Sequence, residues 1–350
     1  MIKNFFLFFF FLLFISSCDK EIENNSAQNE FGEGTYILTD NGLSYTKIGS
    51  DSVTNNIFSN VNTYSIINPK KIKIYGNRLY ILGNDFYATD LNTMKLLGQV
   101  NGFSNAAGCA IITQNRAFVT DKSESSVKLI DLYDYKIISE IETGEGTSPS
   151  FIFNKFDKSF VLNGGNNQNY DSTLITITYR DNLIPLADFS GNLIVGKNPR
   201  SAISTGNVKV LCSGVFDESN TSLNIQSSFY NINPSDLTIN FSQVLPSIYN
   251  ANNLVESWSG NNYYFTAIGG VYRANNSMTN INLIIPIQSD VMKITSEKYA
   301  INDTTDAYSN ILYMNDLTSP GMIYKYNINL SSFVDTISVS GRVLDIQFKN

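Results

Sequence analysis

The stretch from Asn68 to Val100 reads NPKKIKIYGNRLYILGNDFYATDLNTMKLLGQV, and it decides the fold class. Short runs rich in Ile, Leu, Tyr and Phe alternate with polar residues, which is the period-2 pattern of half-buried strands. Turn-forming residues separate the runs, first Gly76-Asn77 and then Gly83-Asn84-Asp85. The stretch therefore predicts four short strands joined by tight turns.

The same unit recurs along the chain. After the first copy near residue 70, further copies open near residues 107, 150, 200, 253, 291 and 342. A step of about 45 residues is the length of one four-stranded propeller blade. We therefore expect an all-β, seven-bladed β-propeller of four-stranded blades spanning residues 33–350, and a pair of β-sandwiches is the alternative that this pattern leaves open.

The two ends of the chain hold complementary parts of one blade. Residues 34–40 (GTYILTD), 43–50 (LSYTKIGS) and 55–60 (NNIFSN) are three predicted strands without an opening strand. Residues 342–348 (RVLDIQF) are an opening strand without followers. Pairing the C-terminal strand with the N-terminal blade would close the ring and leave no exposed sheet edge at the seam.

The first 17 residues have the features of a signal peptide. Lys3 precedes eleven apolar residues, Phe5 to Ile15, and the small residues Ser16 and Ser17 follow. The apolar run is too short for a membrane span, which needs about 20 residues. Ile15-Ser16-Ser17-Cys18 resembles the lipobox of bacterial lipoproteins, which implies that Cys18 is lipidated. An ordinary secretory signal is the alternative.

Residues 18–32 are polar and begin with an acidic cluster, so we expect a tether here. The cluster resembles the surface-export signal of Bacteroidetes lipoproteins. It implies a protein of the outer membrane that is held only by its lipid anchor and is exposed at the cell surface.

Composition excludes several function classes. The net charge of −7 argues against nucleic acid and anionic membrane surfaces as partners. The chain has no histidine, which excludes Ser-His-Asp and Cys-His catalysis and histidine-ligated metals. We expect no cofactor. Cys109 and Cys212 lie in apolar runs and are expected to be buried free thiols, with a disulfide as the alternative.

Residues 127–153, VKLIDLYDYKIISEIETGEGTSPSFIF, resemble the repeat of YVTN/YncE-type propellers, and Gly196-Lys197-Asn198-Pro199 repeats its closing motif. The opening from Gly34 to Asn62 resembles a Bacteroidetes branch of lipoprotein propellers. Ala106-Ala107 departs from the motif, which has proline there, and the last three units lose the "V-I-D" strand. The resemblance implies capture of a small ligand for a TonB-dependent outer-membrane transporter, with a corrinoid as one candidate. Without histidine, no imidazole of this chain could ligate cobalt.

Candidate ligand-binding residues come from loops that share one face of a propeller. Blade-joining loops are expected to place Lys70, Arg200 and Arg342 near the central opening. Residues 164–172, 214–222 and 303–321 are predicted loops between second and third strands. They carry Tyr170, Phe216, Asp217, Tyr308 and Tyr313. Aromatic rings on loops over a rigid scaffold suit a planar or sugar-like ligand. The alternatives are solvated loop charges and loop packing.

Enzymatic signals are weak. No local spacing marks a pair of catalytic carboxylates, and GEGTSP (144–149) lacks the "GK[ST]" of a phosphate-binding loop. We therefore expect a binding protein that is not an enzyme. The alternative is an adhesion module for protein or glycan without a transport partner. Four segments, including Asp171-Ser172-Thr173 and Asp335-Thr336-Ile337, resemble the O-glycosylation sequon of Bacteroidetes, and we expect at least one to be used.

Overall fold

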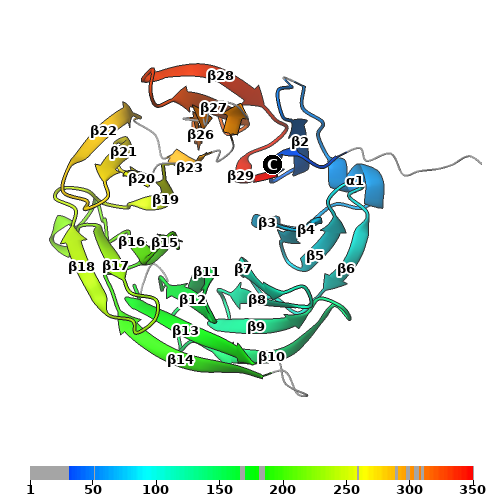
Figure 1. The fold of residues 1–350 in the computed structure, drawn as a ribbon, viewed down its shortest axis with the longest axis horizontal. Helices are drawn as coiled ribbons and strands as arrows, with labels where there is room; N and C mark the ends of the chain where they lie inside the picture. The colour runs from blue at the N-terminus through cyan, green and yellow to red at the C-terminus, as the bar shows by residue number, and fades with distance from the viewer. Residues whose placement is uncertain are drawn as a thin grey trace, which may run out of the picture.

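The computed structural model describes residues 31–50, 52–165, 170–180, 186–257, 260–287, 291–296, 300–302, 307–308 and 311–349. These residues form seven antiparallel blades arranged in a ring around a central opening (Figure 1). The prediction of an all-β, seven-bladed propeller is confirmed.

Six blades have four strands each and follow one another along the chain. Their strands are β3 (Lys71–Tyr75), β4 (Arg78–Leu82), β5 (Phe86–Asp90) and β6 (Leu96–Val100); β7 (Ala106–Thr113), β8 (Arg116–Asp121), β9 (Ser126–Asp131) and β10 (Lys136–Glu142); β11 (Pro149–Lys155), β12 (Lys158–Asn163), β13 (Thr173–Arg180) and β14 (Leu186–Ile194); β15 (Pro199–Ile203), β16 (Val208–Cys212), β17 (Ser228–Ile232) and β18 (Ile239–Val244); β19 (Asn252–Glu256), β20 (Asn262–Ala267), β21 (Gly270–Asn275) and β22 (Ile281–Pro286); and β23 (Val291–Ser296), β26 (Ile311–Asp316), β27 (Met322–Asn327) and β28 (Ser332–Ser338).

The seventh blade closes the ring. The C-terminal strand β29 (Val343–Lys349) pairs antiparallel with β1 (Gly34–Thr39), and β1 pairs with β2 (Gly42–Lys47). Ile346 stands opposite Ile37 across the seam. The first strand of every blade lies innermost (Figure 1), and these strands begin within one residue of the predicted positions. The predicted closure is confirmed.

One predicted strand of the closing blade is wrong. Residues 55–60 do not form a strand, because α1 (Ile57–Asn62) begins there. Asn56 and Thr63, which flank α1, both have left-handed backbones with φ of 58° and 63°. Thr54 alone takes the place of the fourth strand, through a single antiparallel bridge to Tyr45. The apolar side chains that suggested a strand, Ile57 and Phe58, are instead buried by the helix.

The prediction of a loop over residues 303–321 is also wrong. Residues 311–316 form β26, which is the second strand of its blade and pairs with β23. A short hairpin of β24 (Ala300–Asn302) and β25 (Ala307–Tyr308) precedes it. The sequence ILYMND of β26 begins with four consecutive apolar residues, which is typical of a strand buried on both faces, and only the residues after Asp316 turn toward β27. Residues 303–306 and 309–310 lie outside the described residues.

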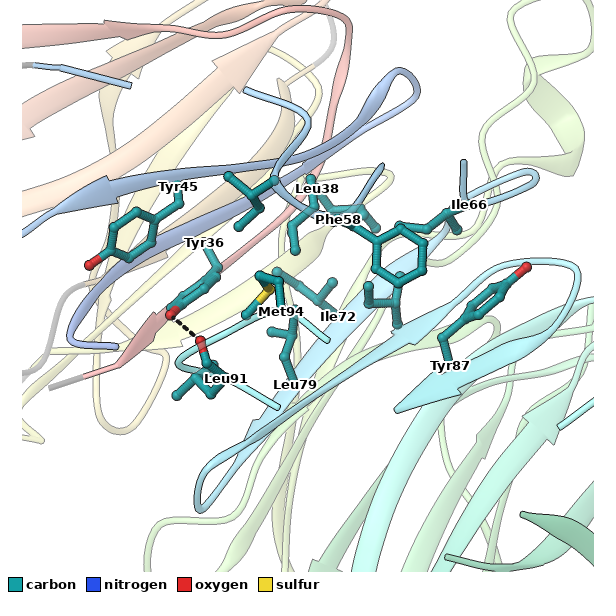
Figure 2. Packing of buried hydrophobic residues seen from close by; sticks show 13 residues of the cluster. Tyr36, Leu38, Tyr45, Phe58, Ile66, Ile72, Leu79, Tyr87, Leu91 and Met94 are labelled. Carbon is teal, nitrogen blue, oxygen red and sulfur yellow. Dashed lines mark hydrogen bonds between the residues drawn. The ribbon is translucent and has the colours of Figure 1, made fainter. Parts of the chain in front are cut away.

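Apolar clusters fill the spaces between neighbouring blades. Figure 2 shows the cluster between the closing blade and the blade of β3, which includes Tyr36, Phe58 and Ile72. The Tyr36 hydroxyl lies 3.3 Å from the Leu91 carbonyl oxygen, to which it donates across this space (Figure 2). Face-to-face packing of twisted sheets therefore holds each blade against the next.

Strand order defines two faces. We call the face with the blade-joining loops and the loops between second and third strands the front face, and the opposite one the rear face. β1 is the second strand of its blade, so the chain enters the ring at Gly34 on the rear face, opposite Lys349. Within the described residues, neither α1 nor the 3-10 turn η1 (Thr221–Leu223) is long and apolar enough to cross a bilayer.

Candidate functional site

The central opening contains a cavity of about 500 Å³. Its walls come mainly from the innermost strands, which are held rigid by the blades behind them. Basic, acidic and aromatic side chains line this cavity. They include Lys71 and Lys73 of β3, Phe151 and Phe153 of β11, Arg200 of β15 and Glu256 of β19.

Aromatic surface in the cavity comes from β11. The Lys71 ammonium lies 4.5 Å from the centre of the Phe151 ring, so a cation–π contact joins two blades that are not neighbours. Phe153 stacks on Phe160 with ring centres 5.4 Å apart, which fixes its orientation. The cavity therefore offers a flat apolar surface beside a positive charge.

Arg200 and Tyr170, both predicted site residues, come together on the front face. The Arg200 Nε–H donates to the Asn198 side-chain oxygen, which orients the guanidinium group. Burial lowers the pKa of Arg200, and the nearby Tyr170 acts in the opposite direction. Gly164 is packed closely here, because a Cβ on it would lie 3.0 Å from Asn198 Oδ1 and 3.5 Å from Arg200 Nε. Lys197 Nζ donates to the Tyr170 carbonyl oxygen at 3.1 Å.

A further lysine, Lys122, lies near Arg200 in a short turn on the front face. Lys122, between β8 and β9, is half-buried, and its main-chain N–H donates to the Asn105 carbonyl oxygen at 2.9 Å. Burial lowers the pKa of Lys122, and the positive charges of Arg200 and Lys70 lower it further. Lys70, Lys122 and Arg200 form what we call the cation cluster. Lys70 and Arg200 were predicted as site residues and Lys122 was not, because its turn resembles any solvated turn.

Phe216 and Asp217 lie on the front-face loop after β16, as predicted, but their contacts are local. The Phe216 ring packs against Tyr249 of the next blade-joining loop, with ring centres 5.5 Å apart. The Asp217 carboxylate accepts from the main-chain N–H groups of Ser219 and Asn220 at 2.8 and 3.1 Å. These hydrogen bonds lower the pKa of Asp217. The contacts agree with a role in shaping the loop.

Three other predicted residues do not join the cation cluster. Arg342 lies on the front face and binds Asp40, with its main-chain N–H 2.7 Å from Oδ1 and its Nε 3.8 Å from Oδ2. Tyr313 is 5% exposed inside β26, where it packs against Phe348, so its prediction as a loop residue is wrong. Tyr308 lies in β25, in the connection between the first and second strands of its blade, which places it at the rear face rather than the predicted front face.

The two described cysteines are buried and free, as predicted. Burial raises the pKa of both the Cys109 and the Cys212 thiol to about 12. Burial therefore disfavours the thiolate, which is the nucleophilic form of cysteine, at both positions. Across the described ranges, no three Cys, Asp or Glu side chains gather in a way that could hold a metal ion.

Comparison with known proteins gives the fold. No protein-family model and no curated protein matches the sequence. A quinoprotein alcohol dehydrogenase-like protein from Bacteroides thetaiotaomicron is similar with a TM-score of 0.66 at 16% identity, over 91% of this chain and 79% of that chain. A protein from Lactobacillus plantarum reaches 0.63 at 12% identity, over 91% and 99%. The hydrazine synthase of Kuenenia stuttgartiensis reaches 0.61 at 12% identity, over 80% and 89%. At such identities the likeness establishes a shared propeller fold and no shared activity.

Proposed function

We propose that this protein is an outer-membrane surface lipoprotein that binds a small ligand in its central cavity and presents it to a TonB-dependent transporter. The observation that carries the proposal is the cavity of about 500 Å³, which is lined by Arg200 and by further aromatic and charged side chains. Small-molecule sites commonly have volumes of about 300–1,000 Å³ and combine apolar walls with a few oriented polar groups.

The scaffold favours binding without rearrangement. The cavity walls are strands of seven packed blades, and Arg200 is oriented by Asn198. Preorganised side chains lose little conformational entropy when a ligand binds. A closed propeller is therefore suited to capturing a dilute ligand.

The position of the chain entry supports delivery from a surface anchor. The chain enters the ring on the rear face at Gly34, whereas the cation cluster lies on the front face. A lipidated Cys18 would leave a tether to Gly34 that spans at most about 58 Å when fully extended. Such a tether would let the front face turn toward a transporter in the same membrane.

The cavity gives little support for catalysis. Glycoside hydrolysis uses two carboxyl groups separated by about 5–10 Å. Among the described residues that line the cavity, Glu256 is the carboxylate, and it pairs with Lys209 at 3.3 Å. We therefore propose binding without chemistry.

Isolation of the native protein from host outer membranes tests the proposal. A tagged chain should co-purify with a TonB-dependent transporter, and extraction followed by mass spectrometry should release a small molecule, with corrinoids examined first. Arg200→Gln should lose that molecule, while Arg342→Gln, an arginine of the same face that is held by Asp40, should retain it. Co-purification of only an adhesion partner, with no small molecule, would favour the interaction-module alternative.

A further inference from the structure

The cation cluster is unusual for this chain. The protein carries a net charge of −7, and the two lysines that are buried among the described residues, Lys128 and Lys209, have carboxylate partners. Lys128 lies 3.3 Å from Asp121, and Lys209 lies at the same distance from Glu256. On the front face, by contrast, both charges that act on Lys122 are positive.

Gathering these like charges costs free energy, because Lys122 and Arg200 are partly buried and both Arg200 and Lys70 repel Lys122. The direction of the Lys122 pKa reflects that cost, since burial and two neighbouring cations all favour the neutral amine. A bound anion would reverse the effect of the neighbours and stabilise all three charged forms.

The geometry of Arg200 adds direction to this charge. Its Nε donates to the Asn198 side-chain oxygen, and Gly164 packs closely against that same oxygen. The guanidinium plane is therefore fixed while the group lines the cavity. Planar guanidinium groups bind carboxylate and phosphate oxygens through paired N–H donors.

We propose that the ligand is an oxyanion-bearing small molecule whose phosphate or carboxylate group binds between Lys70, Lys122 and Arg200. The remainder of the ligand extends into the cavity, along Phe151 and beside Lys71. This inference rests on the proposed function for the existence of a ligand, and it adds the chemical class that the site selects. Glu256 lies further along β19 and is neutralised by Lys209, so it does not oppose an anion at the mouth.

The simplest probes are inorganic phosphate and acetate, compared at equal ionic strength with sodium chloride. The protein is the chain from residue 18 with Cys18→Ser, because the ring closes entirely within residues 31–349. Nuclear magnetic resonance of lysine side-chain carbons follows each ammonium group. Phosphate or acetate should shift the Lys122 signal saturably and raise the pKa of Lys122, and the tighter of the two identifies the kind of oxyanion.

Charge-removing variants locate the site. Arg200→Gln should weaken binding of the anion at least tenfold and, without any anion, should raise the pKa of Lys122 because one repelling charge is gone. Lys136→Met removes an exposed charge that Asp134 already pairs at 2.7 Å, so it should leave binding within twofold of the unmodified protein. The lysine signals other than Lys122 serve as the control for folding. If they are unchanged in the Arg200→Gln protein, that protein is folded, and a change at Lys122 reports the local loss of charge.

The outcomes separate this inference from the proposed function. Two results would overturn it. One is the absence of a saturable response at Lys122 up to about 50 mM phosphate and acetate, which is about the weakest specific binding worth testing. The other is an equal effect of Arg200→Gln and Lys136→Met on anion binding. A neutral molecule released from the native protein would also overturn it, although delivery to a transporter would stand. Anion binding without a co-purifying transporter would support it and remove the delivery role.

Discussion

Replacement of Ile346 by Ala tests the seam of the ring. Ile346 is 1% exposed and belongs to the cluster that joins the closing blade to the preceding one, with Tyr313 and Ile323. The change removes three buried carbons, worth about 2.4 kcal/mol at about 0.8 kcal/mol each. The cavity left behind brings the expected loss of stability to about 3 kcal/mol.

The melting temperature gives the readout. A chain of this size has an unfolding entropy of about 0.7 kcal/mol per kelvin, so about 3 kcal/mol should lower the melting temperature by about 4 °C. Gln347→Ala is the matched control, because Gln347 is on the same strand but its side chain faces the cavity. We expect a change of about 1 °C or less for this surface-type substitution. Equal melting temperatures for the two variants, measured by calorimetry or circular dichroism, would refute the placement of Ile346 in an inter-blade core.

Four further predictions address other parts of the chain. Cys18→Ser should move the protein from the membrane fraction to the soluble fraction, or leave its signal peptide uncleaved, as immunoblots of the fractions would show; unchanged fractionation with a cleaved signal would contradict lipidation. Gly214→Ala should lower the melting temperature much more than Gly206→Ala, because both have left-handed backbones but only the first would place Cβ against backbone atoms; similar losses would contradict that packing. Hydrogen bonds from Lys128 and Ser104 lower the pKa of Glu124 in the folded protein below its ordinary value of 4.5. The stability that these hydrogen bonds contribute is therefore present above pH 4.5 and is lost as the pH falls through the pKa of the folded protein. Melting curves from pH 6 to pH 3 should therefore show Glu124→Gln less stable at the upper end and equal at the lower end, and a constant difference would exclude this role. Thr336 is exposed on β28, so its replacement by Val should remove glycan mass from protein made in its own host if this sequon is used, as intact mass spectrometry would show.

Most strands could be predicted from sequence because each of them is marked twice. In β4, RLYIL carries the strand pattern and Gly76-Asn77 marks the turn before it. The same double signal locates the first strand of every blade. The error at residues 55–60 arose where only one signal was present, since the apolar pair Ile57-Phe58 fits a short helix as well as a strand.

The cavity could be predicted only in part. Lys71 and Lys73 alternate with Ile72 on β3, and the sequence gives no sign that these polar positions face a central cavity rather than solvent. Lys122 is equally inconspicuous, because a lysine in a turn is ordinary until the fold brings Arg200 close to it. Proximity across several blades is a property of ring closure, and single-sequence patterns do not contain it.

Pairing of β29 with β1 at the seam is expected to be a late step in folding. Arg342 and Asp40, which meet there, are 302 residues apart in the chain. Closing so distant a contact is slow, and blades that form earlier must wait with the edge of β1 unpaired. An unpaired edge is a template for association with another chain. We therefore expect chains that stop before residue 343 to self-associate while they fold, because their ring cannot close.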